Sequence, residues 1–251
     1  MSAAMTELWQ VIDTGDILQA EVQAAGMLAL PGLNGADRAE SERYVKALIS
    51  TASSRSPRSY AAAFYRLLMS VGSPTVKKAA SGALREATSL GGYPPGWVTE
   101  IGKPTPDKAW RRHDAFGDEE VIVATFSYGD KQHGVLVRVD SIVLPVAAAV
   151  GISPEPDRLV AALGNVSDSP GDQFEEISLA QARALVEGPL TRAAQSGRGL
   201  TAASATFLPV ARAHIRRLPA EGANPVATFT AAATGITMLS IRTSTPCCLS
   251  P

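Results

Sequence analysis

The sequence predicts an α+β protein, in which an N-terminal α-helical layer of helical hairpins precedes a small α+β domain built on an antiparallel hairpin. In the first hundred residues, apolar side chains recur at three- and four-residue steps between Pro and Gly breaks, which is typical of short helices. Further along, the β-rich runs 121–128 and 134–139 flank a loop at 129–133 that contains Gly and Asp. We therefore expect an α-helical domain at 1–105, an α+β domain at 106–218 and an irregular or disordered tail at 219–251.

Four helices are expected in the N-terminal domain, and each has a recognisable start. Asp16 and Asp37 have the side chains that favour the N-cap position of the first two helices. Pro57 and Pro74, each preceded by Ser, begin the third and fourth helices because proline is tolerated at a first helical position. Glycines 91 and 92 end the fourth helix.

The second domain continues from the hairpin into a segment of ambiguous type. Residues 142–150 are apolar on every face, which fits a buried strand or a buried helix, and three consecutive alanines at 147–149 favour the helix. Gly188 and Pro189 predict an interruption in the helix that follows Ser178. The later elements expected, in order, are helix 157–163, strand 174–177, helix 178–187, a helix that resumes at 190, and helix 203–217 with a bend at Pro209.

Composition and charge exclude several classes of protein. Lys and Arg number 23 and Asp and Glu 24, so no overall field draws the chain to nucleic acid. The longest apolar stretch, 142–152, contains Pro145 and is shorter than the about 20 residues of a spanning helix, so no membrane partner is expected. Glu7 and Asp13 interrupt any secretory signal, which predicts a cytoplasmic location. Two cysteines are too few for a disulfide scaffold or a four-thiolate zinc site.

The C-terminal segment has an unusual composition. Residues 222–251 carry one charge, Arg242, together with both cysteines and no clear period. Such a segment lacks the polar face of a surface helix. Two interpretations remain open: a genuine disordered tail, or a shifted reading frame that begins after about residue 220.

A set of short motifs in the middle of the chain resembles a known family. The motifs are Trp110-Arg111, Phe116-Gly117-Asp118, His133 and Val139-Asp140. Together they resemble a family of uncharacterised actinobacterial proteins, over about residues 20 to 218. The resemblance implies a helical N-terminal half and an α/β C-terminal half, and it implies no activity. The chain departs from the family pattern after Asp140, where residues 141–145 replace a glycine-rich segment.

Common catalytic motifs are missing from the sequence. It has no phosphate-binding GxxxxGK[ST] loop, no GxGxxG, no HExxH, no GxSxG and no CxxC. Its three histidines, His113, His133 and His214, lie in distant segments, so a histidine-rich metal site is not expected. We expect neither a cofactor nor a bound metal.

The best catalytic candidates are His133 with the carboxylates of Asp114, Asp118 and Asp140, because a carboxylate beside an imidazole can orient it as a general base. His133 and Asp140 are seven residues apart, on opposite faces of a regular strand and about 23 Å apart, so they cannot form a dyad without a bulge. Asp130, in the same expected loop, is an alternative partner for His133.

Two functions from different classes follow from these observations. The favoured one is an intracellular protein-interaction or regulatory module, whose helical half binds a protein partner. The alternative is a small-molecule enzyme, in which His133 and the three carboxylates act in an inter-domain cleft. A basic row, Arg212, His214, Arg216 and Arg217, either receives an acidic partner or phosphate or, as we favour, faces water or the acidic middle domain. The sequence favours a protein that is not an enzyme, and it gives no indication of the oligomeric state.

Overall fold

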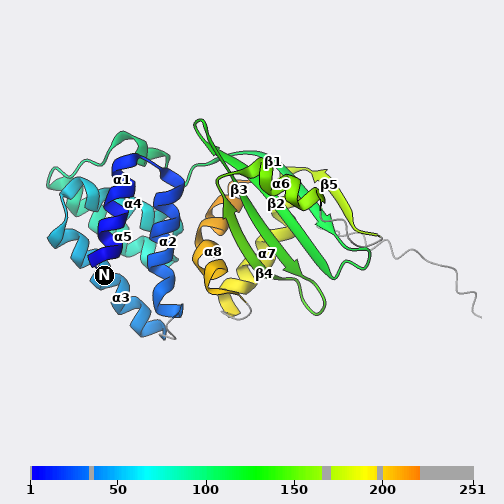
Figure 1. Ribbon diagram of the computed structural model, residues 1–251. Coiled ribbons are helices and arrows are strands. Elements are labelled where there is room, and N and C mark those ends of the chain that lie inside the picture. The colour runs from blue at the N-terminus through cyan, green and yellow to red at the C-terminus, as the bar shows by residue number, and fades with distance from the viewer. Residues whose placement is uncertain (1, 34–36, 166–170, 197–199, 221–251) are drawn as a thin grey trace, which may run out of the picture.

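The helical half of the protein comes first in the chain. A computed structural model describes residues 2–33, 37–165, 171–196 and 200–220 (Figure 1). The tail expected at 219–251 lies outside the described residues beyond position 220. The helical elements of this half are α1 (Ser2–Thr14), α2 (Ile17–Leu33), α3 (Arg38–Arg55), α4 (Arg58–Val71), α5 (Pro74–Ser89) and the short 3₁₀ helix η1 (Gly96–Glu100).

Local capping explains where these helices begin. Asp37 and Glu40 form a reciprocal capping box at the start of α3. Ser73 accepts a hydrogen bond from the Val76 N–H, and Pro74 occupies the first turn of α5. Pro57 is the residue before α4 rather than its first residue, a difference of one position. Helix α1 was not predicted, although its buried Leu8 and Ile12 have helical spacing.

The second half is a five-stranded antiparallel sheet with helices on both faces. Its strands are β1 (Thr105–His113), β2 (Glu119–Tyr128), β3 (Lys131–Asp140), β4 (Val146–Ser153) and β5 (Gln173–Ile177), in the spatial order β4-β3-β2-β1-β5. Its helices are α6 (Pro156–Asn165), α7 (Leu179–Ser196) and α8 (Ala202–Ile215). The predicted α+β class is therefore confirmed. Among the described residues, no helix is both long enough and apolar enough to cross a membrane.

The β2–β3 hairpin forms as predicted, but its turn is shorter. Only Gly129 and Asp130 separate the strands, and Gly129 has φ +62°, which suits a tight two-residue hairpin turn. The loop predicted at 129–133 therefore ends at 130. This places His133 inside β3, where it pairs with Phe126 of β2.

Two other expectations about the second half, the helix favoured at 147–149 and the interruption at Pro189, are wrong, and one strand was not predicted. The segment around the three alanines is strand β4, because it pairs with β3 and its buried Ala147 and Val150 pack in the core with α7 and α8. The Val150 N–H donates to Ser204 Oγ of α8, so the helix covers part of this sheet edge. Helix α7 continues through Pro189 without a break. Strand β1 was not expected at all.

Helix α8 connects the two halves. Its Leu208, Ala211 and Ile215 pack in the core beneath the sheet, whereas Val210 belongs to the core of the helical half. Figure 1 shows α8 between α2 and the sheet. On the opposite face of the sheet, α6 packs over Gly134, where an added Cβ would lie 3.0 Å from the Leu159 side chain. The two cores thus share one helix.

This shared helix predicts that the two halves unfold together. Leu48 of α3 is fully buried in the helical core, and we expect Leu48→Ala to destabilise the protein by about 2–5 kcal/mol. In native-state hydrogen exchange, the slowest amides of α4 and of β2 in the Leu48→Ala variant should lose the same protection free energy relative to the wild type. Unchanged protection in β2 would contradict a single cooperative unit.

Candidate functional site

A cluster of buried polar side chains lies where the two halves meet. Glu21 of α2 and His214 of α8 are both 0% exposed, and His133 of β3 is 1% exposed. Tyr128, the last residue of β2, is also buried. Removing a polar group from water costs free energy unless the group is hydrogen-bonded in the protein. The hydrogen-bond partners of each group therefore decide whether the cluster is stable.

Glu21 is the centre of this cluster, because its carboxylate accepts four hydrogen bonds. Oε1 accepts from Ser70 Oγ of α4 at 2.7 Å and from the Gly102 N–H at 3.0 Å. Oε2 accepts from Tyr128 Oη at 2.9 Å and from His214 Nε2 at 2.9 Å. An ionised carboxylate has acceptor sites only, so four donors satisfy it.

The hydrogen-bond chain continues from His214 to His133. A carboxylate cannot donate, so His214 Nε2 carries the proton toward Glu21, and the other ring nitrogen of His214 lies 3.1 Å from His133 Nε2. The His133 ring is nearly parallel to both Phe126 and Tyr128, with ring centroids 5.7 Å away in each case. These stacked rings and the hydrogen bond fix the orientation of His133.

Burial and the neighbouring groups determine the ionisation of these side chains. Burial alone would raise the pKa of Glu21, but the hydrogen bonds and proximity of His214, with the Ser70 and Tyr128 hydroxyls, hold this pKa below its usual value. Burial, followed by the proximity of His214, lowers the pKa of His133 to about 3. Burial and the adjacent Glu21 raise the pKa of Tyr128. At neutral pH the cluster therefore contains an ionised Glu21 beside a neutral His133 and a neutral Tyr128.

The predicted catalytic set does not come together in the structure. His133 lies near the start of β3, whereas Asp140 ends that strand and pairs with Glu119, seven residues further along the ladder. Asp114 and Asp118 lie in the β1–β2 turn, at the same distant end of the sheet. The assignment of His133 with these three carboxylates is therefore corrected: its partner is His214, which is in a separate helix.

The predicted carboxylates have local structural roles instead. The Asp114 carboxylate accepts from the backbone N–H groups of residues 116, 117, 118 and 119, and so it determines the shape of its turn. Asp140 Oδ1 accepts from the Ile142 N–H at 3.0 Å. Asp130 occupies the two-residue hairpin turn.

Sequence reasoning missed Glu21 and Tyr128 as site residues. One signal was available for Glu21. It precedes Ala24 by three residues and Leu28 by seven, so it lies on the apolar face of its helix. A carboxylate on such a face predicts a buried partner, but nothing local identifies His214 as that partner. Tyr128 had no distinguishing signal at the end of an apolar strand.

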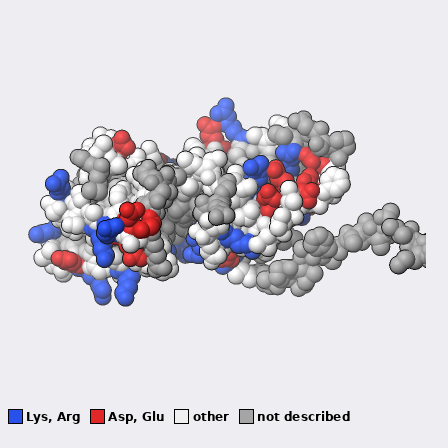
Figure 2. All heavy atoms as spheres, turned by 90° about the horizontal axis from the view of Figure 1, so that it is seen from below, with Lys and Arg blue, Asp and Glu red and all other residues white. Residues whose placement is uncertain are grey.

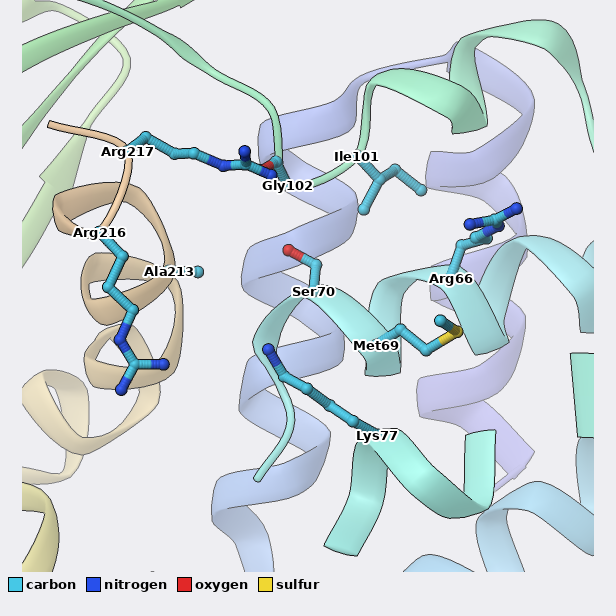
Figure 3. A pocket seen from close by; sticks show the side chains of 9 residues that line it. All are labelled: Arg66, Met69, Ser70, Lys77, Ile101, Gly102, Ala213, Arg216 and Arg217. Atoms are coloured by element: carbon cyan, nitrogen blue, oxygen red, sulfur yellow. The ribbon is translucent and has the colours of Figure 1, made fainter. Parts of the chain in front are cut away.

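A hollow of about 340 Å³ lies at the junction of the two halves, and Figure 3 shows the side chains that line it. Ser70 and Gly102 line it and also donate to Glu21, so the buried cluster is adjacent to one wall of the hollow. Gly102 has φ +72°, and an added Cβ would lie 2.8 Å from Ser70 Oγ, so glycine is required here. The lining residues are Arg66, Met69, Ser70, Lys77, Ile101, Gly102, Ala213, Arg216 and Arg217.

The hollow is strongly cationic. Arg66 of α4, Lys77 of α5, and Arg216 and Arg217 after α8 line it, and none of its described lining residues is acidic. Arg217 Nε donates to the Gly102 carbonyl at 2.6 Å, which joins the end of α8 to the helical half. Burial, followed by the proximity of the positive charges of Arg216, Arg212 and Arg217, lowers the pKa of Lys77.

The basic row expected at the end of the chain's last helix is divided between two environments. His214 points into the buried cluster, whereas Arg216 and Arg217 line the hollow.

Of the described residues, no group of three or more His, Cys, Asp or Glu is placed to hold a metal ion. No protein-family model, curated protein or solved structure matches this chain.

The four donors around Glu21 predict a large effect of its amide analogue. Glu21→Gln places an NH₂ group opposite two donors and removes the negative charge, so we expect a loss of about 3–5 kcal/mol in the free energy of unfolding, measured by urea denaturation. The matched control, Glu7→Gln on the exposed side of α1, should change stability by less than about 0.5 kcal/mol. Equal effects of the two substitutions would contradict the buried network.

The pKa of His133 predicts how stability depends on pH. Because this pKa is about 3 in the folded state and about 6.5 in the unfolded chain, the unfolded state binds more protons as the pH falls below 6.5. Between pH 7 and 5, His133 should therefore remove about 2 kcal/mol of stability. His133→Gln should reduce this slope in urea denaturation. A pH slope that is the same in wild type and His133→Gln would be evidence against a neutral, buried His133.

Proposed function

We propose that this protein is a regulatory binding protein that takes a small polyanion, such as a phosphate ester, into the cationic hollow between its two halves. One observation carries the proposal: four cationic side chains from three separate segments line a hollow whose described lining has no acidic residue. The volume of about 340 Å³ is at the lower end of the range for small-molecule sites.

The chemistry of the lining indicates how such a ligand would be recognised. The Ser70 hydroxyl proton and the Gly102 N–H are both directed at Glu21, so neither is free to donate to a ligand. Recognition would then depend on the ammonium of Lys77 and the guanidinium groups, with arginine suited to bidentate contact with phosphate. Bringing these like charges together without an anion is unfavourable, and a bound polyanion would relieve their repulsion.

The position of the hollow supports a regulatory role. Lys77 belongs to the helical half and Arg216 to the sheet half, so a ligand held by both would stabilise the junction. A ligand that binds only the folded protein raises its stability by mass action. The protein-binding surface expected on the helical half stays a prediction, and the enzyme alternative loses its proposed base because His133 is buried.

Inorganic pyrophosphate is a suitable probe for this proposal. Isothermal titration calorimetry should detect its binding to the full chain, and the affinity should fall as ionic strength rises. Lys77→Met keeps the aliphatic stem but removes the charge, so we expect it to weaken binding at least about 10-fold, or about 1.4 kcal/mol.

The neighbouring residue offers a matched control. Lys78 is exposed, is also in α5 and does not line the hollow, so Lys78→Met should leave pyrophosphate affinity within about twofold of wild type, a change of less than about 0.5 kcal/mol. The proposal fails if pyrophosphate does not bind at millimolar concentration, or if the two methionine variants bind equally.

A further inference from the structure

The far end of the sheet exposes an unusual group of large apolar side chains. Val143 is 94% exposed, Phe116 88%, Ile142 71% and Leu144 58%. We name these four residues the apolar tip. Exposed apolar side chains scattered singly are normal, whereas a group of them marks an interaction surface.

The apolar tip is formed by two neighbouring turns. Phe116 lies in the β1–β2 turn, and residues 142–144 lie in the β3–β4 turn. The Ser141 N–H donates to the Asp118 carbonyl at 2.8 Å, so the two turns contact one another. Both lie at the end of the sheet opposite His133 and the junction with the helical half.

These side chains contribute little to the fold itself. The Asp114 carboxylate organises the first turn through four backbone N–H groups. In the second turn, Asp140 Oδ1 accepts from the Ile142 N–H, and Arg192 of α7 donates to the Pro145 carbonyl. Polar residues would fit both turns, so the structure gives no internal reason for four exposed apolar side chains.

Charges around the apolar tip distinguish between possible occupants. Asp114, Asp118 and Asp140 belong to the two turns, and neither 114–120 nor 139–150 contains Lys or Arg. Two cations also lie beside these turns, namely Arg138, which pairs with Glu119, and Arg192, which donates to the Pro145 carbonyl, so acidic side chains still outnumber basic ones here. Figure 2 shows Asp and Glu side chains interleaved with Lys and Arg on the sheet half, on the side away from the helical half. Anionic lipid would be repelled here, and so would the same tip of a second copy.

We propose that the apolar tip docks a segment of another protein that carries apolar side chains flanked by Lys or Arg. Apolar side chains of that segment would cover Val143 and Phe116, and its cations would face Asp118 and Asp140. The proposal is independent of the cationic hollow, which lies at the other end of the sheet.

Selection of random dodecapeptides displayed on phage against the full chain tests this proposal. We expect the enriched peptides to combine apolar residues with Lys or Arg. Their affinity should fall at least about 10-fold in the Phe116→Ser, Val143→Ser double variant, with no change in melting temperature. Asp118→Asn should weaken the same peptides separately, because it removes a charge without altering the apolar surface.

The matched control is Tyr93→Ser, which removes an aromatic ring that is 75% exposed in the helical half. It should leave peptide affinity unchanged. No enrichment, enrichment of acidic or uncharged peptides, or peptides insensitive to the double variant would overturn the proposal. Two further results would overturn the proposal: binding to phosphatidylglycerol vesicles that the double variant abolishes, or a concentration-dependent dimer that the double variant abolishes.

Discussion

A single carboxylate, that of Glu21, joins elements that are far apart in the sequence. Its donors come from α4, from the Gly102 turn, from β2 and from α8, so both halves of the protein contribute to its solvation. A buried charge with this many donors is stable only while all of them remain in place, because the loss of one leaves unpaired charge away from water. The hydrogen bonds of the Glu21 side chain therefore hold the two halves in their relative position.

The same carboxylate explains why a cationic hollow can exist at the junction. Arg217 donates to the carbonyl of Gly102, whose N–H donates to Glu21, and Ser70, which also donates to Glu21, lines the hollow together with Lys77, so a buried negative charge lies behind one wall of the cationic hollow. This charge offsets part of the repulsion among the cations, while the wall keeps it out of direct contact with a ligand. Meanwhile, the apolar, acidic end of the sheet is well removed from this site. The molecule thus has two surfaces of opposite chemistry at opposite ends of one sheet.

Local signals in the sequence were enough for some elements but not for others. Helix α3 and the β2–β3 hairpin could be predicted because Asp37 and Gly129 act within a few residues of themselves. Strand β1 could not, because its Arg111 and Arg112 read as surface residues, and their partners Glu120 and Asp172 are known only from the fold. For the same reason β4 looked helical: pairing with β3 overrides the helix propensity of its alanines. The buried cluster lay beyond prediction because Glu21 and His214 are 193 residues apart.

At neutral pH, a neutral His133 is held inside a hydrogen-bonded cluster centred on an ionised Glu21. Nuclear magnetic resonance of protein labelled with ¹⁵N-histidine tests it most directly, because the chain has only three histidines to assign. We predict that the His133 ring remains neutral from pH 8 down to about pH 4, since its pKa is about 3. A His133 resonance that titrates near pH 6.5, as a solvent-exposed imidazole does, would contradict the account.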